Sequence, residues 1–157
     1  MPELIQHPRN EIVEEFRRRL EVMKGPVHRG WDMPPELQTP STYIFEDKET
    51  IRKSEVSRQG LYEKVLPIQI EHFVKRASRK EELYPKANDI LRQLVTAIEL
   101  DENLRKGGPD GPGPELVVGY GMIENDIVEM SHEIVNVILL YQVSYYDTFL
   151  GYTGKCL

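Results

Sequence analysis

The residues of this sequence that could bind a metal or catalyse a reaction do not complete any recognisable motif. No two of the four histidines stand three or four residues apart, the spacing that puts two metal ligands on one face of a helix. His132 and Glu133 begin like a zinc-protease motif, but Ile, Val and Asn follow and the second histidine is missing. The sequence therefore predicts no metal ion. The histidines are His7, His28, His72 and His132.

Other short patterns also lack a part that their chemistry requires. The glycine run Gly107–Gly113 has no Lys-Ser or Lys-Thr after it, and a predicted strand follows where a phosphate-binding loop needs a helix. Asp101–Asn103 begins like a calcium loop, but Arg105 takes the place of the next oxygen ligand. The single cysteine, Cys156, excludes an internal disulfide and suits a reducing compartment. We therefore expect a binding or assembly protein that is not an enzyme and uses no cofactor.

Charge is unevenly distributed along the chain. The 157 residues include 26 acidic and 20 basic side chains, for a net charge of −6. Residues 1–50 carry −3, residues 51–100 carry +3 and residues 101–157 carry −6. A protein that binds nucleic acid by itself normally has a net basic surface, so this balance argues against that class. A basic middle and an acidic end favour head-to-tail contacts between copies of the chain.

Two segments have the pattern of helices that lie on a core. Residues 10–24 start with an asparagine suited to an N-cap, repeat apolar residues at helical spacing, and end before Gly-Pro. Residues 78–100 start with Ser78 and Glu81 in the spacing of a capping box, and Pro85 then falls in an early turn. Both segments are predicted to be amphipathic helices.

Several other segments alternate apolar and polar residues in the way of β-strands. The charged residues 47–59 lie between two of them and are predicted to form the long tip of a hairpin, whereas the proline-rich residues 26–41 are mostly irregular. Residues 115–122 and 127–130 form either one strand or a bulged pair. The predicted strands are residues 27–29, 41–46, 61–75, 115–122 with 127–130, and 133–146.

The order of these elements predicts an α+β fold, an antiparallel β-sheet of four to five strands with two helices packed on one face. The length fits a single domain over residues 1–157, with a core of residues 10–148 and a C-terminal tail of residues 149–157. The longest apolar run, residues 137–141, is too short to cross a membrane, so no membrane contact is expected.

The last predicted strand is apolar on one face and half apolar on the other. That second face carries Ile134, Ile138 and Leu140 among polar residues. We expect another subunit or a terminal segment to cover it. Trp31, in the proline-rich stretch, either packs this stretch onto the core or anchors an interface.

The hairpin tip is basic, with Arg52, Lys53 and Arg58. It is either a solvated loop or a surface that docks on acidic side chains, which the last third of the chain supplies. A reversal of charge here is therefore expected to affect assembly more than folding.

The order of the elements and the general sequence pattern resemble those of the tail terminator proteins of long-tailed bacteriophages. The resemblance covers about residues 10–148 and has no short diagnostic motif. It is carried by the run from Tyr43 through Glu49-Thr50-Ile51, the strand VLPIQIEHFVKRA, the helix YPKANDILRQLVTAIELDENL, the segment LVVGYGMIENDI and the final alternating strand.

The resemblance implies a non-enzymatic α+β subunit that assembles into a hexameric ring, without a cofactor. Such a ring caps the tail tube, stops its polymerisation and joins the tail to the head. It implies contacts with other copies of the chain, the tail tube protein and head-tail connector or neck proteins, and DNA that passes through the channel without sequence readout. It also implies a place in the virion, after assembly in the host cytoplasm.

Two alternatives remain open at this point. The chain could be a head-completion or neck adaptor of the same virion, built on the same sheet and helices. It could also be a small dimeric α+β enzyme or ligand-binding domain with Tyr120, His132 and Glu133 near a pocket.

Overall fold

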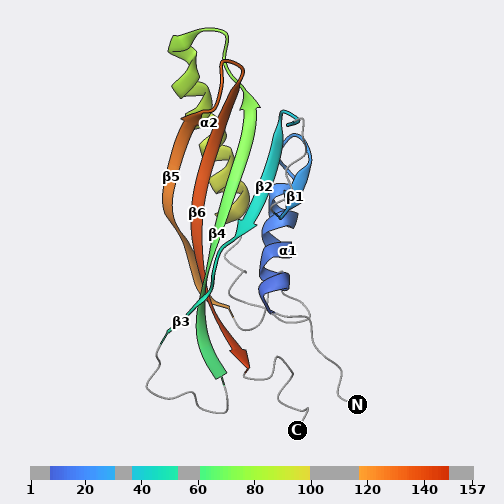
Figure 1. Cartoon of the computed structure of the whole chain (residues 1–157), viewed down its shortest axis with the longest axis vertical. Helices are drawn as coiled ribbons and strands as arrows, with labels where there is room; N and C mark the ends of the chain where they lie inside the picture. Colours follow the sequence, from blue (N-terminus) through green and yellow to red (C-terminus); the bar gives the residue numbers. More distant parts are fainter. Residues whose placement is uncertain (1–7, 31–36, 53–60, 100–116, 149–157) are drawn as a thin grey trace.

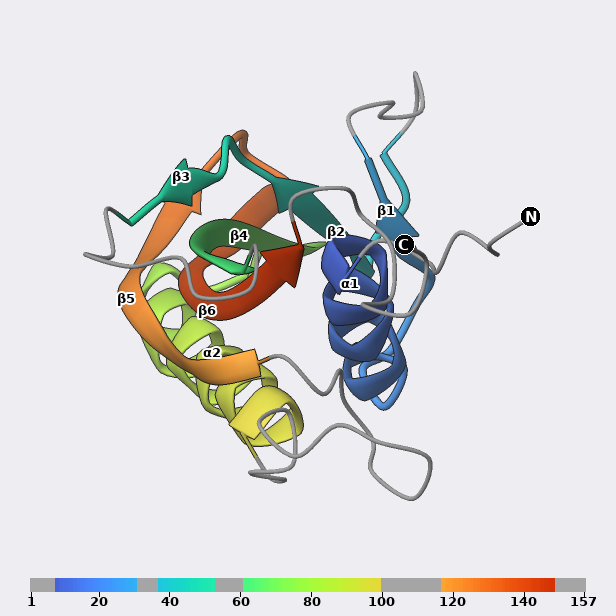
Figure 2. The ribbon, with the colours of Figure 1, turned by 90° about the horizontal axis from the view of Figure 1, so that it is seen from below.

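Six strands form one sheet, and both helices lie on the same side of it (Figures 1 and 2). The structure is a computed structural model that describes residues 8–30, 37–52, 61–99 and 117–148. Helix α1 spans Pro8–Leu20, and α2 spans Leu83–Glu99 after the short 3₁₀ helix η2 (Lys80–Glu82). The strands are β1 (Val27–Arg29), β2 (Ser41–Glu46), β3 (Thr50–Ile51), β4 (Leu61–Lys75), β5 (Val117–Glu129) and β6 (Ile134–Thr148).

The sheet is built around the long antiparallel pair of β4 and β6. Its strand order is β1-β2-β4-β6-β5, and β3 pairs separately with β4. All neighbours are antiparallel except β1 and β2, which run parallel. Strand β5 therefore forms one edge of the sheet, and its pairing with β6 is interrupted by a bulge between Met122 and Glu124.

The main core lies between the sheet and the two helices. Alternate residues of β6 from Val135 to Tyr145 face the helices and are at most 2% exposed. They meet the apolar stripes of both helices, which is the burial that stabilises an amphipathic helix. The helix residues of this core are Ile12, Val13, Phe16 and Leu20 of α1 and Leu83, Ala87, Leu94 and Ile98 of α2.

The predicted α+β class, with two helices on one face, is confirmed. The sheet has six strands, more than the four to five expected, because two residues of the charged hairpin tip pair with β4 as β3. The capping box is wrong: Arg79 occupies the N-cap of η2 without a side-chain hydrogen bond, and the regular helix starts only at Leu83. Helix α1 ends at Leu20 and not at residue 24, because Met23 N donates to Leu20 O and tightens the turn.

A buried polar pair, His72 and Thr42, lies on the helix side of the sheet. Thr42 Oγ1 is 2.6 Å from His72 Nδ1, and the two residues are at most 2% exposed. Burial lowers the pKa of His72 to about 4, so the folded protein keeps this imidazole neutral at neutral pH. In the unfolded chain the same group titrates near its model value of 6.5.

We expect the free energy of unfolding to decrease as the pH falls from about 6.5 towards 4, because only the unfolded state then binds a proton at His72. The difference between the two pKa values corresponds to about 3 kcal/mol once the pH is below both. Urea denaturation at several pH values between about 7 and 4.5 measures the effect. The variant His72→Gln keeps a hydrogen-bonding side chain that does not titrate, so equal pH slopes in both proteins would contradict this assignment.

Candidate assembly surfaces

The three residues that a small enzyme could have used do not lie together. Tyr120 is on the helix side of β5, with its ring 6.2 Å from that of Phe16, and it is paired across the sheet with Val143. His132 and Glu133 are exposed in the turn before β6. Ten residues of an extended strand separate Val143 from Glu133, roughly 33 Å. Within the described segments, no three His, Cys, Asp or Glu side chains are grouped so that they could hold a metal ion.

No helix in the described part of the chain is long and apolar enough to cross a membrane.

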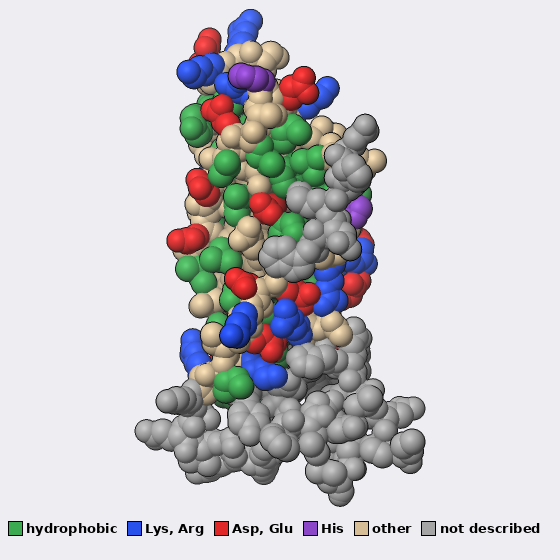
Figure 3. All heavy atoms as spheres, viewed as in Figure 1, with side chains coloured by type: hydrophobic (Ala, Val, Ile, Leu, Met, Phe, Trp, Pro, Cys, Tyr) green, Lys and Arg blue, Asp and Glu red, His purple; other side chains and the backbone are tan. Residues whose placement is uncertain are grey.

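The face of the sheet turned away from the helices, here called the open face, carries a mixed acidic and apolar patch. Ile138 and Leu140 of β6 are half-buried there, and they pair with Asp126 and Glu124 of β5. Together with Gln69 of β4 these side chains line a shallow hollow. Figure 3 views the molecule from this side and shows acidic side chains among hydrophobic ones over β5. Carboxylates beside partly exposed apolar groups suit contact with a basic protein surface.

A second patch of the open face is already covered by aromatic packing. Tyr43, Phe45 and Phe73 form a small buried cluster, with the rings of Tyr43 and Phe73 5.6 Å apart, edge to face. Ile134 is half-buried and packs against this cluster, together with Leu37. Of the three apolar residues predicted on this face, Ile138 and Leu140 therefore lie in the acidic patch, whereas Ile134 supports the aromatic cluster.

Arg52 is the one residue of the predicted basic tip that lies in the described part of the chain. Its side chain is 58% exposed, and its Nη1 is 3.3 Å from Oε1 of Glu63. Its backbone N–H donates to the carbonyl oxygen of Glu63 at 2.9 Å, which fixes the start of the tip to β4. Trp31, Lys53 and Arg58 lie outside the described residues, so their role stays a prediction.

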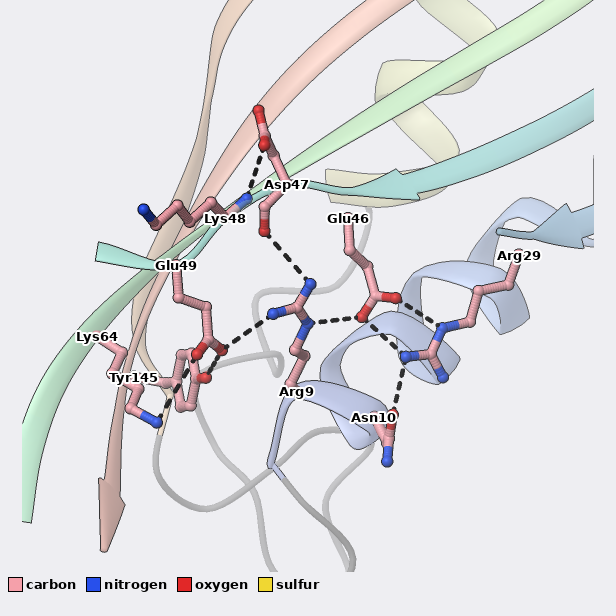
Figure 4. A network of polar contacts seen from close by, with 9 residues as sticks. All are labelled: Arg9, Asn10, Arg29, Glu46, Asp47, Lys48, Glu49, Lys64 and Tyr145. Carbon is pink, nitrogen blue, oxygen red and sulfur yellow. Dashed lines mark hydrogen bonds and ion pairs between the residues drawn. The ribbon is translucent and has the colours of Figure 1, made fainter. Parts of the chain in front are cut away.

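A polar network joins the start of α1 to the sheet (Figure 4). Glu46 of β2 accepts hydrogen bonds from Arg9 Nε at 3.0 Å and from Arg29 Nη2 at 2.8 Å. Further along the chain, Glu49 accepts a hydrogen bond from the hydroxyl of Tyr145 and lies 3.7 Å from Lys64 Nζ. Arg9 Nη1 lies 4.0 Å from Glu49 Oε1 and links the two carboxylates, so α1, β1, β2, β4 and β6 meet in one network of ion pairs and hydrogen bonds.

The network keeps the side chain of Glu46 negatively charged. Burial by itself would raise the pKa of this carboxyl, but the hydrogen bonds and charges of Arg29 and Arg9 outweigh burial and lower the pKa. The carboxylate therefore stays ionised in the folded protein and joins α1 and β1 to β2 through Arg9 and Arg29.

The acidic residues Glu124 and Asp126 were not singled out from the sequence. After a first register shift between Val117 and Gly119, even-numbered positions such as Tyr120 lie on the helix side, and the bulge after Met122 moves the even-numbered positions to the open face. The signal that could have found them is the Gly-rich start of β5, since glycine in a strand often marks a bulge nearby.

Comparison with known proteins gives a similarity of fold. No protein-family model matches the chain. No curated protein sequence matches it either. Among solved structures, the chain is similar to a chain from the virion of a native gene transfer agent (GTA) particle, with a TM-score of 0.52 and 11% sequence identity. The match covers 89% of this chain and 95% of the other, so the two proteins share a fold over nearly their whole length.

Proposed function

We propose that this chain is a structural protein of a phage-like virion and, more narrowly, a tail terminator that forms a ring at the end of the tail tube. The observation that carries the proposal is the fold shared with a chain of the GTA virion over 89% of this protein. The order of helices and strands that resembles tail terminators is an independent, sequence-based reason for the narrower assignment. In this role the chain needs no catalytic group, and its partners are its own copies, the tail tube protein and the head-tail connector.

The surface of the subunit supports a role in assembly. Large apolar side chains remain exposed on β5 and directly after it, among them Ile123 at 48% and Met130 at 53%. Met122 and Ile123 are neighbours in the strand, and exposed apolar side chains that cluster in this way on a small protein commonly mark a surface that a partner covers. The hollow lined by Ile138 and Leu140 adjoins them on the open face.

The proposal is tested by measuring the mass of the purified protein in solution and by electron microscopy of mixtures with tail tubes. We expect a ring-sized oligomer that sits at one end of the tube and prevents further growth. A strictly monomeric protein that leaves tube growth unchanged would overturn the proposal. Binding to isolated heads and not to tubes would replace the tail terminator with a neck adaptor of the same virion.

Reversing the charge of the hairpin tip with Arg52→Glu and Lys53→Glu is expected to weaken self-association at least roughly tenfold, because the tip is proposed to dock on an acidic surface. Folding should change little, since the ion pair of Arg52 with Glu63 is largely exposed and contributes at most about 1 kcal/mol. Light scattering across a dilution series measures association, and thermal melting measures folding.

The matched control reverses two adjacent exposed basic residues at the other end of the sheet, Arg79→Glu and Lys80→Glu. The tip has no special role if both double variants lower association to the same extent, or if melting temperature and association fall in parallel.

A further inference from the structure

The outer edge of β5 is a long strand edge without a partner in the described part of the chain. The strand spans Val117–Glu129 and stands last in the strand order of the sheet. Exposed strand edges pair with other chains unless charges or bulges protect them. This edge has both protections, but it also carries four of the eight large apolar side chains that are exposed in the described segments. These four are Met122, Ile123, Val128 and Met130.

The charges of this edge argue against pairing between two β5 strands. Glu124 and Asp126 both face the open face, and neither forms an ion pair with another described residue. A two-fold pairing of β5 with β5 would bring the same carboxylates of two copies together, and like charges across a strand pair are destabilising. The natural counterpart of the edge is a basic surface.

A basic groove lies on the helix side of the same molecule. It runs between the C-terminal end of α1 and the length of α2, as two adjoining hollows of about 470 and 530 Å³ that share Met23, Asp89 and Gln93. Its apolar lining includes Val22, which is 77% exposed. Four cations line it against one acid, Asp89, and none of the four forms an ion pair with another described residue. The cations are Lys24, Lys75, Lys86 and Arg92.

The edge and the groove match in chemistry and in length. Both carry apolar side chains, and the edge adds carboxylates where the groove adds ammonium and guanidinium groups. From Met122 to Met130 the extended chain is roughly 26 Å long. The 17 residues of α2 extend about 26 Å.

We propose that the β5 edge of one copy docks in the α1–α2 groove of a second copy. The contact is heterologous, because each copy offers its edge to one neighbour and its groove to another, and repetition of such a contact produces a ring or a filament. This inference rests on the proposed self-assembly and names the two surfaces that meet.

Two double variants and their mixture test the contact. The edge variant Glu124→Lys with Asp126→Lys has a basic edge and a basic groove, whereas the groove variant Lys86→Glu with Arg92→Glu has both surfaces acidic. Each variant by itself should associate roughly 100-fold more weakly than the natural chain, because its edge and groove now repel. An equimolar mixture should associate again, since each edge then finds a groove of opposite charge on the other variant.

The control is Glu81→Lys with Glu82→Lys, which reverses two exposed acids of η2 outside both surfaces and should associate like the natural chain. Light scattering measures association, and thermal melting checks that each variant is folded. If the natural chain associates but the edge and groove variants associate equally well, or their mixture stays monomeric, the inference is wrong and the proposed function stands. If the natural chain itself stays monomeric at all concentrations, the inference is wrong, and if it also leaves tube growth unchanged, the proposed function is overturned as well.

Discussion

Replacing Gly25 with alanine is expected to destabilise the protein by about 3–5 kcal/mol, enough to unfold a marginally stable domain. Gly25 has a φ of +89°, a left-handed conformation that side chains with a Cβ rarely adopt. A Cβ at this position would also lie 1.8 Å from the carbonyl oxygen of Pro40 and 2.6 Å from its carbonyl carbon. Because these are backbone atoms, the backbone at Gly25 and the backbone at Pro40 would have to move apart.

Gly30→Ala is the matched control for this prediction. Gly30 also has a positive φ, +116°, but a Cβ there would meet no atom within 4 Å. The substitution Gly30→Ala should therefore lower the free energy of unfolding by about 1–2 kcal/mol, which is the strain of the backbone conformation without the clash. Urea denaturation of both variants measures the difference. A similar loss of stability at the two positions would show that the close contact with Pro40 adds nothing to the cost of a Cβ at residue 25.

Much of the fold could be predicted from local patterns. The strands at residues 27–29, 41–46 and 61–75 start and end where the sequence placed them, because their alternation and β-forming residues are local properties. The parallel pairing of β1 with β2 could not be predicted in this way. It depends on contacts between segments distant in the sequence, such as the hydrogen bond from Thr42 N to Pro26 O at 2.9 Å.

The candidate surfaces could be predicted only in part. Ile138 and Leu140 follow from the alternation of β6, because every second residue of a strand faces the same side. The acidic residues opposite them depend on the bulge in β5, which no period of two reveals. The basic groove could not be predicted from the sequence, because Lys24 and Lys86 come together only when α1 and α2 pack on the sheet.

Arg19→Met is expected to lower the free energy of unfolding by about 3 kcal/mol and to weaken self-association. The Arg19 side chain is 5% exposed and its Nε lies 2.9 Å from Oε1 of the equally buried Glu15. Its Nη1 donates to the carbonyl oxygen of Ile98 at 2.6 Å, in the last turn of α2, and to the hydroxyl of Tyr120 at 3.3 Å. Cations stabilise the C-terminal end of a helix, and removal of Arg19 leaves the buried Glu15 dependent on Arg18, whose side chain is 55% exposed and lies 2.5 Å away.

The variant should affect assembly because Arg19 connects three elements. It holds α1 against the end of α2 and against Tyr120 of β5, and these elements carry the edge and the groove proposed to meet. Methionine keeps most of the apolar length of the side chain, so the loss reports the charge and its hydrogen bonds.

The matched control is Arg17→Met on the exposed side of the same helix. Arg17 lies 2.6 Å from Glu14 and 2.8 Å from Glu21, distances no longer than the 2.9 Å between Arg19 and Glu15, but these pairs are in contact with water. Solvent screens such pairs, so the loss of Arg17 should lower the free energy of unfolding much less than the loss of Arg19. Urea denaturation and light scattering of the two variants measure both effects. Equal losses of stability in Arg17→Met and Arg19→Met would show that burial does not strengthen the ion pair of Arg19. Unchanged association of Arg19→Met would show that the contacts of Arg19 with α2 and β5 do not affect assembly.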